Sequence, residues 1–339
     1  KERNCEATEQ LRKNHCERKH TSPMNWNGKP YHSLDFEMKS RFGQKVYKIA
    51  LDGHMTCPNR DGTLGTRGCI FCSEGGSGDF AESLKTDVWD QIEAAKKRVS
   101  NKTGSDKNIN YIAYFQSFTN TYGPVERLRP LYRAAMAPED VVILSVATRP
   151  DCLPPPVLEL LAECAAEKEV WVELGLQTIH PASAAYLRRG YDLEVYDRAV
   201  EQLHQIGAQV VVHQILGLPG ETEEMMAETA RYIGCSGADG VKFHLLHVLR
   251  GTDLAEEWQA GRVPVMELET YLHALEACLR VLPREVVIHR LTGDGAKRDL
   301  LAPMWSGDKK RVLNAIHQTF LRDDLEQGSA LERESAPGF

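Results

Sequence analysis

The chain has 339 residues, enough for one large domain with an extension or for two ordinary domains, and its net charge of -7 argues against a protein coated by nucleic acid. No apolar run is long enough to cross a bilayer and no secretory signal peptide is visible, so we expect a cytoplasmic protein with no membrane partner. Nine cysteines in such a chain favour metal binding over disulfides, because a reducing compartment keeps thiols free.

Residues 1–23 are polar and lack periodicity, which predicts a flexible N-terminal tail, and residues 326–339 suggest a second flexible tail. Between them, short apolar runs alternate with amphipathic stretches. The runs are nearly continuous, as expected of parallel strands that are buried on both faces. In chain order, the expected strands are 46–51, 110–115, 141–147, 170–175, 209–216, 240–248 and 286–289.

Amphipathic helices are predicted between these strands. One begins after Thr86 and carries cations at 96–98, where they complement the helix dipole. A second begins after Asp192 and ends at Gly207, and a third presents a leucine-rich stripe over 268–282. The succession of strand–helix units predicts an α/β fold with a parallel sheet, which binds ligands at the carboxyl ends of its strands.

Three cysteines follow the first expected strand within one glycine-containing loop. Cys57, Cys69 and Cys72 lie in the run Cys-Pro-Asn-Arg-Asp-Gly-Thr-Leu-Gly-Thr-Arg-Gly-Cys-Ile-Phe-Cys. Three thiolates can hold three irons of a four-iron cluster and leave the fourth iron open to a ligand that is not protein, whereas a structural metal site normally completes its shell with a fourth residue. Phe71 supplies an apolar wall beside such a cluster.

Two other chemistries fit the same loop. His54 as a fourth ligand would give a structural zinc site, and Cys69 with Cys72 alone could form a redox dithiol. Zinc sites of this kind usually belong to small modules with little core, whereas this loop opens a long α/β pattern. The residues alone favour a cluster and leave both alternatives open.

The cysteine run resembles the cluster loop of radical S-adenosylmethionine (radical SAM) enzymes. In detail it is similar to the bacterial YhcC/YtqA-type branch, which is related to the radical SAM domain of the Elongator catalytic subunit. Further matching segments are 114–122, 148–152, 173–178, 216–221 and 244–247. The resemblance implies a partial (β/α)6 TIM-like barrel over residues 24–250, with a C-terminal α/β extension over 251–325 that closes it.

The resemblance also implies two cofactors, a [4Fe-4S] cluster and S-adenosylmethionine (SAM). In these enzymes the amino nitrogen and a carboxylate oxygen of SAM chelate the open iron. One electron, from a reductant such as flavodoxin or ferredoxin, then yields methionine and a 5′-deoxyadenosyl radical that abstracts hydrogen from a substrate. Kinship with Elongator, which acts on the tRNA wobble uridine, suggests a tRNA base as substrate. The alternatives are a small metabolite, or a zinc-stabilised scaffold or RNA-binding protein without turnover.

Several positions match family residues that contact SAM. Gln177 matches the glutamine of a Gly-x-Gln motif, and Arg189 has the spacing of an arginine that pairs with the SAM carboxylate. His213 stands where related enzymes have an aspartate that touches ribose. Without a ligand, Gln177 could satisfy backbone groups and Arg189 could be a solvated cation at a helix end.

Three further positions are implied as SAM contacts although they depart from the family pattern. Gln116 and Asn120 replace a Gly-Gly-Glu-like turn that touches the methionine amino group. Ala147 replaces a glutamate that commonly contacts SAM, and Glu173 on the next strand is expected to compensate for it.

Lys242, His244 and His247 are the predicted catalytic residues on the substrate side. Lys242 and His244 alternate along one strand and should share a face, and polar residues inside a barrel are costly unless they meet a substrate or each other. The basic run 309–311 is interpreted as the start of a charged helix. The residues expected to line the substrate opening are Arg149, Asp151, Arg290 and Asp294.

Overall fold

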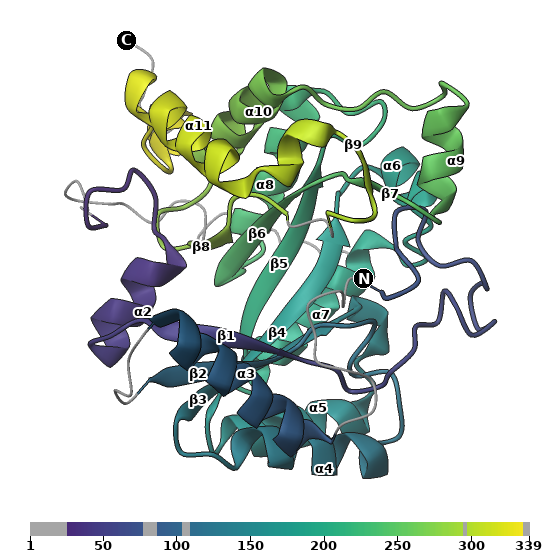
Figure 1. Ribbon diagram of the computed structural model, residues 1–339, viewed down its shortest axis with the longest axis vertical. Helices are drawn as coiled ribbons and strands as arrows, with labels where there is room; N and C mark the ends of the chain where they lie inside the picture. Colours follow the sequence, from purple (N-terminus) through teal and green to yellow (C-terminus); the bar gives the residue numbers. More distant parts are fainter. Residues whose placement is uncertain (1–25, 77–86, 104–108, 294–296, 335–339) are drawn as a thin grey trace, which may run out of the picture. The chain divides into compact units, whose positions relative to one another are not determined.

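The computed structural model describes residues 26–76, 87–103, 109–293 and 297–334. In this part of the chain, seven strands form one sheet in the order β1-β2-β3-β4-β5-β6-β8, and β7 pairs with β9 (Figure 1). The strands are β1 Val46–Leu51, β2 Asn110–Phe115, β3 Val141–Thr148, β4 Glu169–Gln177, β5 Gln209–Leu216, β6 Gly240–Leu245, β7 Val248–Leu249, β8 Val287–Arg290 and β9 Leu300–Ala302. The pairs β1–β2, β2–β3, β3–β4 and β6–β8 are parallel, which confirms the predicted α/β fold.

Helices lie before β1, in most of the connections between strands, and after β9. They are α2 Leu34–Phe42, α3 Val88–Thr103, α4 Val125–Met136, α5 Pro155–Ala165, α6 Pro181–Tyr186, α7 Leu193–Gln205, α8 Glu223–Cys235, α9 Asp253–Gln259, α10 Leu268–Arg280, α11 Lys309–Arg322 and α12 Ser329–Glu334, with short 3-10 turns at Pro150–Cys152 and Met304–Gly307. None of the helices in the described ranges is long and apolar enough to span a membrane.

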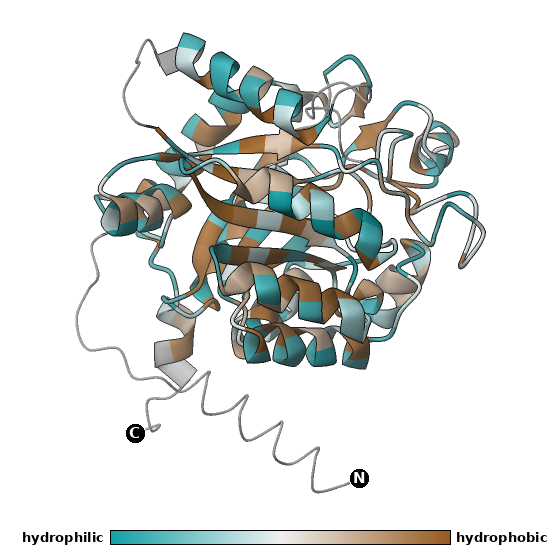
Figure 2. Cartoon of the chain, turned by 90° about the horizontal axis from the view of Figure 1, so that it is seen from below, coloured by the Kyte–Doolittle hydropathy of each residue, from teal (hydrophilic) through white to brown (hydrophobic). Residues whose placement is uncertain are grey.

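The chain divides into two compact units, which are described separately. Unit 1 comprises residues 1–36, 177–186 and 212–339, and unit 2 comprises residues 37–176 and 187–211. The unit boundaries fall inside α2, β4 and β5 and directly after α6. Figure 2 shows that the strands are mostly hydrophobic, whereas the helices carry both hydrophobic and hydrophilic residues.

In unit 2, one face of the sheet is apolar and the other carries polar groups. Phe115, on the apolar face of β2, packs against Tyr132 of α4 with ring centroids 5.6 Å apart. On the opposite face, the register pairs Tyr114 with Ser145 and Ser145 with Trp171. Buried polar side chains need partners, and those on this face find them in one another.

Glu173 is the centre of that polar face. Its side chain is fully buried, and its carboxylate lies 2.9 Å from the ammonium of Lys48 and accepts a 2.7 Å hydrogen bond from Ser145. The Lys48 ammonium also lies over the Tyr114 ring, 4.5 Å from its centroid, and 5.7 Å from that of Trp171. An ion pair on β1 and β4 is thus bracketed by aromatic rings, which keep water away from it.

In unit 1, the predicted leucine stripe of α10 is buried as expected. Leu275 and Leu279 are fully buried, and the Tyr271 hydroxyl donates a 2.6 Å hydrogen bond to the Leu291 carbonyl. The basic run starts α11 as predicted, where the Asp308 side chain accepts from the Arg311 backbone N–H. In unit 2, Asp192 does precede α7, but its side chain makes no capping hydrogen bond. Thr86 lies outside the described residues.

The strand predicted over 240–248 is wrong as a single element. β6 ends at Leu245, and the backbone N–H of Leu246 donates to the Leu216 carbonyl at 2.9 Å, which takes the chain out of the register of β6. Val248 and Leu249 then pair antiparallel with β9. The apolar run continues through both strands, so composition alone did not reveal the break.

The structure also differs from the predicted flexible segment at residues 326–334. Gln327 is fully buried, and its amide donates to the carbonyls of Pro283 at 2.7 Å and Val286 at 2.9 Å and accepts from the His32 backbone N–H at 2.8 Å. Helix α12 follows it. The polar composition suggested solvent exposure, but the buried Gln327 amide connects the backbone near His32 with the backbone at Pro283 and Val286 within unit 1. The predicted tail at 1–23 lies outside the described residues.

Replacing Gln327 with alanine is expected to destabilise the protein by about 2–3 kcal/mol, because two buried carbonyls lose their donor. Urea unfolding measures this. Ser329→Ala is the matched control, since its hydroxyl accepts only a 3.4 Å hydrogen bond from Arg280. A loss below 0.5 kcal/mol would be ordinary for the control. Equal losses for both variants would contradict the role of Gln327.

Candidate functional site

The three cysteines of the loop after β1 lie close together in unit 2, each half-buried and unoxidised. Backbone hydrogen bonds shape the loop: the N–H of Arg60 donates to the Cys57 carbonyl at 2.8 Å, and the N–H of Cys72 donates to that of Cys69 at 3.0 Å. Burial, followed by the charges of Cys72 and Cys57, raises the pKa of the Cys69 thiol to about 11. The backbone bond between Cys72 and Cys69 places these two residues in one tight turn.

The donor set fits an iron–sulfur cluster. Soft thiolates are the ligands of such clusters, and three of them leave one iron open. Within the described ranges, no three His, Cys, Asp or Glu side chains surround a single metal ion. A four-iron cluster is wider than one ion, so its ligands need not converge on a point. His54, the fourth ligand in the zinc alternative, has its Nδ1 3.9 Å from the Asp52 carboxylate.

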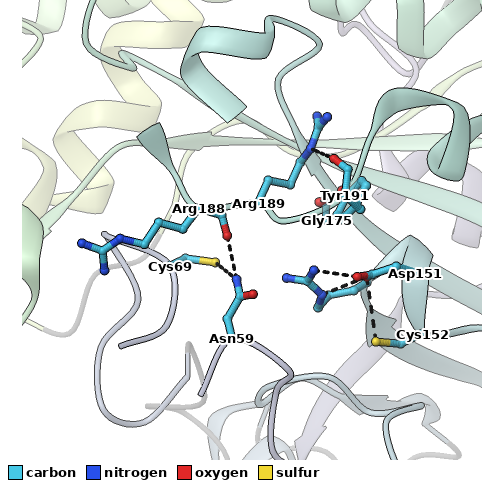
Figure 3. A network of polar contacts seen from close by, with 9 residues as sticks. Asn59, Cys69, Asp151, Cys152, Gly175, Arg188, Arg189 and Tyr191 are labelled. Atoms are coloured by element: carbon cyan, nitrogen blue, oxygen red, sulfur yellow. Dashed lines mark hydrogen bonds and ion pairs between the residues drawn. The ribbon is translucent and has the colours of Figure 1, made fainter. Parts of the chain in front are cut away.

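Asn59 is a functional candidate that the sequence analysis missed. Its side-chain N–H groups donate to Cys69 Sγ at 3.4 Å and to the Arg188 carbonyl at 2.7 Å, and the residue is 5 % exposed (Figure 3). A short amide two residues after the first cysteine was the available signal. The sequence of the loop alone does not show that this amide contacts Cys69, ten residues later, and Arg188 in a distant segment.

Arg149 and Asp151 form a pair beside the cysteines. The guanidinium donates to both carboxylate oxygens, from Nε at 2.9 Å and from Nη2 at 2.7 Å, and lies over the Tyr191 ring at 5.4 Å from its centroid. The positive charge is close enough to lower the pKa of the Cys69 thiol, against the larger effect of burial. These residues were predicted to line a substrate opening, and the structure places Arg149 beside the cysteine loop.

Arg189 contacts the same tyrosine. Its guanidinium carbon is 4.7 Å from the centroid of the Tyr191 ring, and Nε donates to the Tyr191 carbonyl at 3.2 Å. The Tyr191 hydroxyl donates to the Gly175 carbonyl at 2.5 Å, as Figure 3 shows. Arg189 is 6 % exposed, so it is not the solvated cation of the alternative interpretation. Its fork is oriented by aromatic and backbone contacts.

Asn120 follows β2 and is almost completely buried. Its Nδ2 donates to the carbonyls of Phe115 and Ala147, each at 3.1 Å, which ties together the ends of β2 and β3. Its Oδ1 is buried and has no hydrogen-bond partner among the described residues. A buried acceptor without a donor is costly and is suited to the amino group of a ligand. Gln116 is half-buried, and its backbone N–H donates to the Leu51 carbonyl at 3.3 Å.

Glu173 and Phe71 complete the predicted cofactor contacts of unit 2. Phe71 is half-buried within the cysteine loop. The carboxylate of Glu173 is engaged by Lys48 and Ser145 on the polar sheet face. The structure therefore gives Glu173 protein partners of its own, a relation between three strands that the sequence analysis did not anticipate.

In unit 1, three histidines predicted as site residues lie near one another: His213 within β5, His244 in β6 and His247 just after β6. The rings of His213 and His244 have centroids 4.9 Å apart. A Cβ placed on Gly293 would lie 3.0 Å from Cε1 of His247 and 3.7 Å from Nδ1 of His244. The glycine thus leaves room for two rings that approach the same point.

Two cationic residues of unit 1 lie opposite each other on the neighbouring strands β6 and β8. Lys242 of β6 lies opposite Arg290 of β8, and Lys242 is 4 % exposed. Gln177, the last residue of β4, belongs to unit 1, is half-buried and has a left-handed φ of 69°. Asp294, also predicted to line the opening, lies outside the described residues.

Replacing Gly190 with alanine is expected to disturb the cysteine site. Gly190 has a φ of 80°, and an added Cβ would lie 3.3 Å from Leu64 Cδ1 and 3.4 Å from both Arg149 Nη2 and Asn59 Oδ1. Gly207→Ala is the matched control, since Gly207 has a φ of 78° in open space. Both variants should lose about 1 kcal/mol of stability, but only Gly190→Ala should release iron faster to a chelator. Equal iron release would contradict the crowding.

Comparison with known proteins agrees with this geometry. The family model of the Radical SAM superfamily matches residues 62–233, and the model of the Radical_SAM C-terminal domain matches residues 238–322. YtqA from Bacillus subtilis is 43 % identical over 91 % of this chain and 96 % of its own length. This similarity confirms the predicted YhcC/YtqA-type kinship.

Two matches connect the chain to proteins with other domains. tRNA uridine(34) acetyltransferase from Methanocaldococcus jannaschii is 28 % identical over 45 % of this chain and 28 % of its own length. The solved structure of Elp3 from Methanocaldococcus infernus superposes with a TM-score of 0.63 and 18 % identity, covering 83 % of this chain and 64 % of that one. The latter confirms the partial-barrel fold. The chain belongs to the radical SAM superfamily.

Proposed function

We propose that this radical SAM enzyme modifies a base of tRNA, with the cysteine site of unit 2 generating the radical and the histidine and lysine cluster of unit 1 meeting the substrate. The proposal is supported by the tRNA-directed name of one relative and by the cationic residues of unit 1. The net charge of -7 restricts any RNA contact to a local surface.

Family membership makes the protein an enzyme that uses a [4Fe-4S] cluster and SAM. It also removes the alternative of a zinc-stabilised scaffold without turnover. When bound, the cluster supplies the single electron that cleaves SAM and starts hydrogen abstraction. Cys57, Cys69 and Cys72 are the residues that would hold it. Asn59 and Arg149 place a hydrogen-bond donor and a positive charge beside these thiolates.

Two residues of unit 2 are proposed to orient SAM. Asn120 presents its buried Oδ1 as an acceptor for the SAM amino group, while its Nδ2 stays fixed on two backbone carbonyls. Arg189 is proposed to hold the SAM carboxylate, because a guanidinium can bind both oxygens at once. Aromatic stacking on Tyr191 fixes the plane of that guanidinium. Gln116, Gln177 and His213 remain further candidates for SAM contacts.

On the substrate side, cations and imidazoles have separate proposed roles. Lys242 and Arg290 are proposed to attract an anionic group, as a phosphate of RNA would provide. His244 and His247 are proposed to move protons at Nδ1 or Nε2 once the radical has formed, because an imidazole can titrate near neutral pH. Gly293 permits both rings to approach one point.

The observation that carries the proposal is the cluster of three half-buried thiols with a donor amide and a guanidinium beside them. Anaerobically reconstituted protein should release 5′-deoxyadenosine from SAM when given a strong reductant, and release should increase with tRNA from a deletion strain. Nucleoside profiling of that tRNA should show a missing modification. An unchanged profile, with SAM cleavage intact, would reject tRNA and favour a small metabolite.

Asn120→Leu is expected to weaken SAM binding about tenfold, because the ligand amino group loses its acceptor. Anaerobic equilibrium dialysis measures the dissociation constant. Tyr132→Phe is the matched control: the Tyr132 hydroxyl donates to the Asn120 backbone carbonyl at 2.6 Å, so its loss affects local stability without removing Oδ1. Similar weakening in both variants would show that Asn120 acts through the fold and not on SAM.

A further inference from the structure

Both the side chain and the backbone of Asn59 form hydrogen bonds within the protein. One amide hydrogen points to the Arg188 carbonyl at 2.7 Å, and the Asn59 backbone carbonyl accepts from the Gly68 N–H at 2.8 Å. These bonds fix the side chain between the cysteine loop and the segment after α6. The second amide hydrogen then lies on Cys69 Sγ at 3.4 Å. At 5 % exposure, the amide has little access to water.

The partners of this amide are themselves constrained. Arg188 has a left-handed φ of 60°, which turns its carbonyl to Asn59, and Gly190 follows with a φ of 80°. A Cβ on Gly190 would lie 3.4 Å from Asn59 Oδ1, so the glycine leaves room for the amide. The donor is therefore preorganised, and it would not have to rotate when the charge of the sulfur changes.

A hydrogen bond to a cluster ligand affects the two oxidation states of the cluster unequally. Reduction adds one negative charge, part of which resides on the thiolate sulfurs. A donor aimed at such a sulfur stabilises the reduced state more than the oxidised state, and therefore raises the reduction potential. The effect is larger where water is excluded, because the local dielectric is low.

We propose that Asn59 is a positioning residue that raises the reduction potential of the cluster held by Cys57, Cys69 and Cys72, so that a one-electron carrier protein can reduce it. This inference rests on the cofactor chemistry of the proposed function. It adds a residue outside the three ligands and assigns it to electron entry rather than to SAM or substrate binding.

The test is an EPR-monitored redox titration of the reconstituted protein. In Asn59→Leu, which keeps the side-chain volume but has no donor, the ratio of reduced to oxidised cluster at a fixed potential should fall about tenfold, which equals about 59 mV for a one-electron couple. Asn59→Asp, which replaces the donor with a negative charge, should shift the potential further in the same direction. Thr63→Val is the matched control, because the Thr63 hydroxyl in the same loop bonds to Tyr122 and not to a cysteine.

Each outcome decides one question. A lowered potential in both Asn59 variants, with normal iron content and an unchanged control, supports the proposal. An unchanged potential in fully loaded Asn59→Leu overturns it while leaving the proposed function intact. If both Asn59 variants lose their iron but melt normally, Asn59 holds the loop and does not set the potential, and the proposal is also wrong. Parent protein that binds no cluster would instead reject the proposed function itself.

Discussion

Replacement of Cys69 with alanine is expected to abolish the cluster and with it the reductive cleavage of SAM. Two remaining thiolates leave a second iron without a protein ligand, and Cys69 is also the sulfur that receives the Asn59 hydrogen bond. SAM cleavage should fall more than a hundredfold, since even changes outside the ligand shell of a metal commonly cost about 10–100-fold. Iron and sulfide per chain, together with 5′-deoxyadenosine release, measure the result.

Cys235→Ala is the matched control for this prediction. Cys235 is also unoxidised and half-buried, but it lies at the end of α8 in unit 1. Its replacement should leave the iron and sulfide content and the cleavage of SAM unchanged. Retention of full iron content and activity by Cys69→Ala would refute the assignment of the loop as the cluster site.

Replacement of Lys48 with methionine is expected to destabilise the protein by about 3 kcal/mol. Glu173 is fully buried, and losing its cationic partner leaves a carboxylate in an apolar setting. The value lies at the lower end for buried pairs, because the Lys48 side chain is 24 % exposed. Glu173→Leu should cost less, since the remaining ammonium can reach water. Urea unfolding at constant pH measures both.

The double variant Lys48→Met/Glu173→Leu separates charge from packing. If the cost comes from an uncompensated buried charge, the double variant should recover most of the stability lost in Lys48→Met. Additive losses in the two single variants would contradict an energetic coupling. SAM binding should be retained in the double variant if Glu173 serves the sheet, and should be lost if Glu173 contacts the cofactor as the sequence predicted.

The strands were predictable because a parallel strand is recognisable from the apolar composition of its own short segment. The runs at 46–51, 110–115 and 209–216 coincide with β1, β2 and β5. Continuous apolar composition follows from burial on both faces, and it requires no knowledge of the rest of the chain. The cysteine loop could also be recognised from sequence, because its three cysteines are close together in the chain and the proposed chemistry depends on their number.

The parts that sequence did not reveal depend on partners far along the chain. Asn59 meets Arg188 across 129 positions, and Lys48 meets Glu173 across 125. These long-range contacts depend on how the strands align in the sheet and on where the loops lie in the folded chain, and neither can be read from composition. The same holds for Gln327, whose polar neighbourhood suggested solvent although its amide is buried. Arg149 was predicted to line a substrate opening, but its contact with the Tyr191 ring could be identified only in three dimensions.

Non-glycine residues with left-handed backbone conformations recur near the cysteine loop. His54 precedes it with a φ of 53°, and Phe118 and Arg188 have φ values of 61° and 60°. Side chains branched at Cβ tolerate this region worst, while glycine tolerates it best. A library for directed evolution should therefore omit valine, isoleucine and threonine at these three codons. Glycine scanning there would report how much of the loop's shape is imposed by its surroundings.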